Sequence, residues 1–160
     1  MEHRIVDNFL PEADFQKLKD AITDNYFPWF LGKGVGAYAE KDDVYLTHTF
    51  YDNSTPNSDF IPLLNPILMR LSPKEIIRIR ANLYTKKDRL IEHARHVDCT
   101  YPHKAFILYL NTNNGFTRMS DGHIVDSVAN RGVYFDGGQP HNSTNCTDEL
   151  VRINLSFNYL

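Results

Sequence analysis

The segment "ARHVDC" (94–99) contains a histidine and an aspartate two positions apart, His96 and Asp98. In an extended chain, side chains at positions i and i+2 point to the same side. Imidazole and carboxylate groups on one side can bind the same metal ion, so the pair is a candidate for two metal ligands. Because the chain has 7 histidines, such a triplet can also arise by chance on a solvated segment. The pair alone therefore does not establish a metal site.

A third ligand has to come from elsewhere, and His141 is the best candidate among the remaining histidines. It follows an expected strand and a Gly-Gly turn, with room for several strands between it and Asp98. Two imidazoles and one carboxylate form the set that holds iron(II) in non-haem oxygenases and leaves coordination positions open. Zinc accepts the same kinds of ligand and remains an alternative.

Arg152 is the candidate for binding an anion, because it lies on the expected polar face of the last strand. A guanidinium at the end of a concave pocket needs an anion, and a carboxylate matches it with two parallel hydrogen bonds. Tyr109, on another polar strand face, could donate its hydroxyl to the same anion. Arg152 could instead pair with Asp148 or Glu149 in the preceding turn, as many surface residues do.

The elements that must position these side chains differ between the two halves of the chain. Apolar residues at helical spacing predict two helices. The first covers 11–25 with Pro11 in its first turn, and the second covers 58–71 with Ser58 as its N-cap. Apolar and polar residues then alternate in the segments 76–85, 104–112, 130–137 and 150–159, which predicts strands.

We therefore expect one domain over 1–160, with a helical support region (1–74) and a catalytic β core (75–160). Helices followed by many strands indicate a β-sandwich or barrel with the helices packed on one outer face. The polar strand faces would line a concave site. Glycine-rich residues 32–43 read as a loop, and we expect substrate-contacting loops at 32–58, 85–94 and 113–124.

The composition argues against some kinds of binding partner. The net charge of −3 argues against a dominant nucleic-acid surface, and no apolar run approaches the length needed to span a membrane. The N-terminus does not resemble an export signal, so we expect a cytoplasmic protein in which Cys99 and Cys146 are reduced thiols.

Several segments occur in an order that is shared with a known family. They are "ANLY" (81–84), "HVD" (96–98), "YLN" (109–111), "NRGVYFDG" (130–137), His141 and "RINLSF" (152–157). This order resembles the Fe(II)/2-oxoglutarate-dependent dioxygenases, most of all the compact prolyl 4-hydroxylase-like branch with its small phage-type members. The resemblance covers residues 75–160 well and the first half of the chain more loosely.

The resemblance implies a fold, a cofactor set and roles for individual residues. The fold is a mainly β, double-stranded β-helix (jelly roll), and the cofactors are Fe(II), 2-oxoglutarate and O2. The implied iron ligands are His96, Asp98 and His141. Arg152 would bind the distal carboxylate of 2-oxoglutarate with Tyr109 beside it. Tyr84 and Asn82 would lie next to the co-substrate or the substrate.

The reaction implied is hydroxylation of a substrate C–H bond with release of succinate and CO2. A peptidyl proline is the first expectation for the substrate, so a protein or peptide is the expected partner besides 2-oxoglutarate. Two alternatives stay open. One is a 2-oxoglutarate oxygenase that acts on a small molecule or a nucleic acid, and the other is a metal-binding jelly-roll module without turnover.

Overall fold

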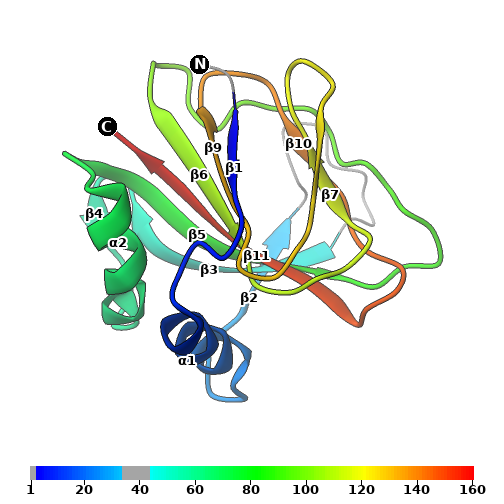
Figure 1. Ribbon diagram of the computed structural model, residues 1–160, viewed down its shortest axis with the longest axis horizontal. Helices are drawn as coiled ribbons and strands as arrows, with labels where there is room; N and C mark the ends of the chain where they lie inside the picture. The colour runs from blue at the N-terminus through cyan, green and yellow to red at the C-terminus, as the bar shows by residue number, and fades with distance from the viewer. Residues whose placement is uncertain (1–2, 34–43) are drawn as a thin grey trace.

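The computed structural model describes residues 3–33 and 44–160 and consists of two antiparallel sheets with helices outside the larger one (Figure 1). The larger sheet has the spatial order β1 (Arg4–Val6), β9 (Gly132–Asp136), β6 (Lys104–Tyr109), β11 (Val151–Tyr159), β5 (Ile76–Thr85), β3 (Val44–Asp52) and β2 (Phe30–Lys33), and β4 (Thr55–Pro56) pairs with β3. The smaller sheet has the order β10 (Asn142–Ser143), β7 (Phe116–Arg118) and β8 (Ile124–Asp126). This two-sheet arrangement is that of a jelly roll, as expected.

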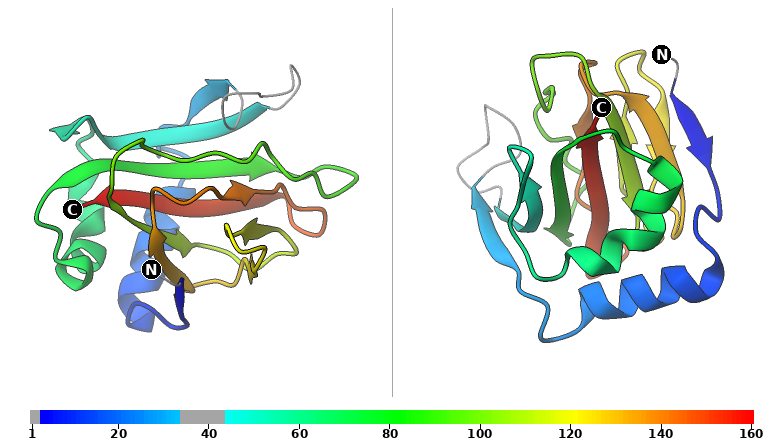
Figure 2. Two further views of the ribbon diagram at one scale, coloured as in Figure 1. Left: turned by 90° about the horizontal axis from the view of Figure 1, so that it is seen from above. Right: turned by 90° about the vertical axis from the view of Figure 1, so that its left-hand side faces the viewer.

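The helices pack on the outer face of the larger sheet, as the sequence predicts (Figure 2). They are α1 (Glu12–Thr23), the 3-10 helix η1 (Ile61–Leu64) and α2 (Asn65–Leu71). Alternation in β5 and β11 directs Ile79 and Leu155 outward, where they join one apolar core with Leu18 and Ile67 of the helices. The polar side chains of the same strands consequently face inward, toward the smaller sheet.

The first half of the chain is not only helical, so the expected division at residue 74 is wrong in that respect. Residues 44–52 form β3, which lies beside β5 within the larger sheet. Its apolar face is interrupted by His48, which is buried and bonds through Nδ1 to Pro28 O (2.8 Å) and through Nε2 to Ser58 Oγ (2.7 Å). A buried histidine in place of an aliphatic residue weakens the alternation that identifies strands.

The expected helix over 58–71 is divided by its prolines. Pro62 lies in the first turn of η1 and Pro66 in the first turn of α2, because proline tolerates that position and not a helix interior. Ser58 is not a helix cap; its hydroxyl accepts a hydrogen bond from Phe60 N (3.0 Å). Helix α1 begins one residue after Pro11, which occupies the N-cap position.

The expected loops differ from the structure in two places. The range 32–58 contains all of β3, and 113–124 contains β7. Gly32 and Lys33 belong to β2, and the rest of the expected glycine-rich loop lies outside the described residues. Cys99 and Cys146 are both free thiols. Among the described residues, no helix has the length and apolar character needed to cross a membrane.

Candidate metal centre

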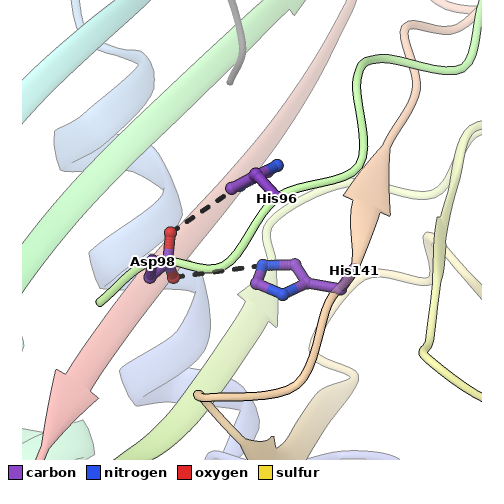
Figure 3. A group of neighbouring side chains, drawn as sticks. All are labelled: His96, Asp98 and His141. Carbon is purple, nitrogen blue, oxygen red and sulfur yellow. Dashed lines mark ion pairs between the residues drawn. The ribbon is translucent and has the colours of Figure 1, made fainter. Parts of the chain in front are cut away.

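His96, Asp98 and His141 converge on one point inside the jelly roll (Figure 3). Nε2 of His96 lies 3.7 Å from Oδ1 of Asp98, and Nε2 of His141 lies 3.9 Å from Oδ2. The potential ligand atoms all lie within 4.8 Å of one another, close enough to bind one ion after small side-chain rotations. Among the described residues, this is the group of histidine and acidic side chains able to hold a metal.

The backbone brings these residues together through one isolated bridge. His96 N donates to His141 O and His141 N donates to His96 O, each at 2.9 Å. Residues 95–99 do not form a strand, and this single antiparallel bridge is the pairing at His96. The two histidine rings lie 4.8 Å apart as a result.

Hydrogen bonds fix the tautomer of both histidines. Nδ1 of His96 faces Ala94 O at 3.1 Å, and Nδ1 of His141 faces Gln139 O at 3.2 Å. Because a carbonyl oxygen only accepts, each Nδ1 carries the hydrogen, which in a neutral imidazole leaves the lone pair on Nε2. Both lone pairs are thus on the nitrogens nearest to Asp98, as metal binding requires.

The electrostatic environment favours the ligand forms of these groups. Burial acts to raise the pKa of Asp98, but the charges of Arg78, His141 and His96 outweigh it and hold the pKa below its ordinary value. Burial lowers the pKa of His141, although the carboxylate of Asp98 opposes this. Near neutral pH the centre therefore contains a carboxylate and a neutral imidazole.

Arg152 is fully buried, and its hydrogen-bond partners are all uncharged. Its Nε donates to Ser127 Oγ at 2.7 Å and its Nη2 to Thr117 Oγ1 at 3.2 Å. Its Nη1 donates to Ser143 Oγ at 2.6 Å and to Thr144 O at 3.2 Å. Burial lowers the pKa of Arg152, but a guanidinium remains charged in proteins.

Arg152 does not pair with a carboxylate of the preceding turn, which was the alternative. No described carboxylate lies within 4 Å of Arg152, and Asp148 instead accepts from Asn114 N at 3.0 Å. A buried charge without a counter-ion is costly, which makes this position suited to an anionic ligand.

Two tyrosines expected near Arg152 lie beside it. The rings of Tyr84 and Tyr109 each lie 5.5 Å from its Cζ, and Tyr109 donates its hydroxyl to Thr117 Oγ1 at 2.8 Å. Burial raises the pKa of Tyr84 to about 12 and also raises that of Tyr109, so both remain neutral hydrogen-bond donors.

Asn82 shares the inner face, two positions before Tyr84 on β5. Its side-chain amide donates to Asn154 Oδ1 at 3.0 Å and to Ser156 Oγ at 3.3 Å, both on β11. These bonds tie the two central strands together, and none of them reaches Arg152 or the histidines.

Arg78 lies at this site although it was not among the expected site residues. Its Nη2 donates to Oδ1 of Asp98 at 2.6 Å, and the two side chains are 19% and 12% exposed. The signal was the alternation of β5, which places Arg78 on the same polar face as Asn82 and Tyr84. The serine and threonine partners of Arg152 had no signal in the sequence.

No protein-family model matches the chain, and no curated protein sequence matches it either. Solved structures match along nearly its whole length. A Pseudomonas putida prolyl-4-hydroxylase is 19% identical, with 98% of this chain and 91% of that chain covered and a TM-score of 0.66. A Trichoplax adhaerens prolyl hydroxylase, solved with a hypoxia inducible factor peptide, is 13% identical over 99% and 83%, with a TM-score of 0.70.

A third similar structure is that of a carbocyclase and not of a prolyl hydroxylase. SnoK, a non-haem α-ketoglutarate-dependent carbocyclase from nogalamycin biosynthesis, is 14% identical over 98% of this chain and 78% of its own, with a TM-score of 0.70. The chain therefore has the fold of the 2-oxoglutarate- and iron(II)-dependent oxygenases, which confirms at the level of fold the resemblance seen in the sequence.

Proposed function

We propose that this protein is an Fe(II)- and 2-oxoglutarate-dependent dioxygenase, formed as a single domain, that hydroxylates a substrate C–H bond. The observation that carries the proposal is the link between the metal centre and the buried guanidinium. Ser143, two residues after His141, accepts a hydrogen bond from Arg152 at 2.6 Å. Two residues of extended chain span about 7 Å, a length that a five-carbon dicarboxylate can bridge.

His96, Asp98 and His141 would hold the ion. Two imidazoles and a carboxylate fit iron(II), and the Nδ1 hydrogen bonds restrain the rotation of both rings. The chemistry that bound iron(II) would supply there is oxidation by O2 coupled to decarboxylation of 2-oxoglutarate to succinate and CO2. The ion pair with Arg78 keeps the carboxylate of Asp98 in one orientation for this purpose.

Arg152 would bind the distal carboxylate of 2-oxoglutarate, with Tyr109 and Tyr84 beside it. Its hydrogen bonds to Ser127, Ser143 and Thr117 fix the guanidinium before the ligand arrives. A preorganised partner loses less entropy on binding, and the buried location excludes water that would weaken the ion pair. Asn82 lies between this end of the site and the metal-binding end.

A peptidyl proline is the substrate class that we favour, with a peptide or protein as partner and the cytoplasm as the compartment. The support is the fold shared with two prolyl hydroxylases, one of them solved with a peptide fragment. The fold shared with a carbocyclase favours the second candidate, a small-molecule substrate.

The test is iron(II)-dependent conversion of 2-oxoglutarate to succinate by the purified protein. We expect slow conversion without substrate and none in the His96→Ala, Asp98→Ala double variant, whereas His123→Ala, at an exposed histidine, keeps it. Proline-containing peptides would then be screened for a mass gain of one oxygen atom. Bound iron without succinate formation would support the non-catalytic module, and unchanged iron content in the double variant would contradict the metal assignment.

A further inference from the structure

Arg80 lies on the inner face of β5 between two residues already placed at the site. Side chains alternate along a strand, so Arg78, Arg80 and Asn82 share one face, with neighbouring positions about 7 Å apart. Arg78 contacts the candidate metal ligand Asp98, and Asn82 lies on the side of Arg152. Arg80 therefore borders the space in which a substrate must meet the metal centre.

The polar atoms around Arg80 are incompletely paired among the described residues. Nε of Arg80 is buried without a hydrogen-bond partner, and its Nη2 lies 3.9 Å from Oδ1 of Asp52, a carboxylate that is 47% exposed. Asn158, which faces Arg78 across the strand pair, is 1% exposed, and neither its Nδ2 nor its Oδ1 has a partner. Buried donors of this kind are usually satisfied by a ligand or by water.

With a metal ion and 2-oxoglutarate bound, the charges of the site would not balance. A divalent ion and the two carboxylates of 2-oxoglutarate cancel one another, and Asp98 offsets Arg78 through their 2.6 Å ion pair. The guanidinium charges of Arg152 and Arg80 then remain, and the carboxylate of Asp52, 3.9 Å from Arg80, offsets one of them, which leaves one positive charge in excess. Among the described carboxylates, only Asp52 lies within 4 Å of Arg80. An excess of positive charge in a partly enclosed site attracts an anion.

We propose that the substrate carries an anionic group, a carboxylate or a phosphate, and that Arg80 binds it, with the amide of Asn158 as a neighbouring donor. This inference rests on the proposed function, since it assigns the co-substrate to Arg152 and the metal and leaves Arg80 for the substrate. A guanidinium fork suits either anion. The side chain of Arg80 is 31% exposed, so a substrate can reach it from solvent.

The experiment measures binding of two simple probes, acetate and inorganic phosphate, to protein loaded with Mn(II) and saturating 2-oxoglutarate under anaerobic conditions. Mn(II) is paramagnetic, so the nuclear relaxation of a bound probe reports both its binding and its closeness to the metal. Arg80→Gln removes the charge, and Arg70→Gln makes the same change at an exposed position of helix α2, outside the larger sheet. Arg80→Lys keeps the charge without the fork.

We expect saturable binding of at least one probe to the wild type. Arg80→Gln should weaken probe binding about tenfold and not more, because a partly exposed charge is partly screened. Arg80→Lys should weaken it less, since the charge remains, and Arg70→Gln should leave it unchanged. The preferred probe identifies the anion as carboxylate or phosphate. The 2-oxoglutarate affinity, measured by calorimetry, should be the same in all four proteins.

Three results would overturn the inference. The first is that neither probe binds the loaded wild type, and the second is equal binding by Arg80→Gln. The third is a parallel loss of 2-oxoglutarate affinity in Arg80→Gln, which would place Arg80 in the co-substrate site. In all three cases the wild type still binds 2-oxoglutarate. If the wild type does not bind it with Mn(II), the proposed function fails instead.

Discussion

Arg78 and Asp98 form a short ion pair, 2.6 Å from Nη2 to Oδ1, between the inner face of β5 and the segment that carries His96. The pair connects the larger sheet to the candidate metal centre. It means that the carboxylate has a cationic partner before any metal arrives. Arg78 therefore both orients Asp98 and competes with a metal ion for its charge.

Replacing Arg78 by Met should destabilise the metal-free protein by about 3 kcal/mol, because it leaves a largely buried carboxylate (12% exposed) without its cationic partner. Mn(II) should restore part of this loss, since the ion supplies the missing positive charge. Urea unfolding with and without Mn(II) measures both effects. An equal loss in the two conditions would show that Asp98 does not contact the ion.

Arg152→Ala should weaken 2-oxoglutarate binding by roughly 2–5 kcal/mol, which corresponds to about 30-fold or more. The reason is that one carboxylate of the co-substrate would be buried without its partner. Calorimetry with Mn(II) under anaerobic conditions measures the affinity, and Arg70→Ala, at an exposed position of helix α2, is the control. Normal affinity in Arg152→Ala would exclude the anion role of this residue.

Gly115→Ala should disturb the same pocket from a neighbouring turn. A Cβ at Gly115 would clash with Asn145 O and lie 2.5 Å from Cδ of Arg152, so the guanidinium must shift. We expect weaker 2-oxoglutarate binding and a lower melting temperature. Gly138→Ala, whose Cβ would lie 3.4 Å from its nearest neighbour, should change neither; similar behaviour of the two variants would contradict the described packing.

The pair Glu92 and Arg118 predicts a pH dependence of stability. Hydrogen bonds from Arg118 (2.6 and 2.9 Å) and Asn142 (3.0 Å) lower the pKa of Glu92 to about 2. Because the folded pKa is depressed, the stabilisation is present above pH 4.5 and is lost as the pH falls toward 2. The side chain is 42% exposed, so screening limits the effect to about 1 kcal/mol or less. Glu92→Gln should flatten the unfolding free energy over this window, and an unchanged slope would contradict the pairing.

The sequence predicted the elements with strong periodicity and missed the short ones. Strand β5 is found at the expected residues, and β11 begins one residue later, because both alternate without interruption. Strands β7, β8 and β10 have only two or three residues, too few to show a period. Strand β3 is long but was hidden by His48 on its buried face.

The site could be predicted in part. His96 and Asp98 were identified from local spacing, but the bridge that joins His96 to His141 is a long-range pairing that spacing does not reveal. The alternation of β5 places Arg78 and Arg80 on its polar face but does not show what they contact. The neutral partners of Arg152 come from separate turns and short strands, and no periodic pattern marks them.

The central claim is that His96, Asp98 and His141 hold a metal to which 2-oxoglutarate binds. Anaerobic calorimetry of 2-oxoglutarate with Mn(II), comparing the wild type with His141→Ala and with the control His123→Ala, tests it most directly. We predict metal-dependent binding to the wild type and the control, and none to His141→Ala. Absence of binding to the wild type, or unchanged binding to His141→Ala, would contradict the account.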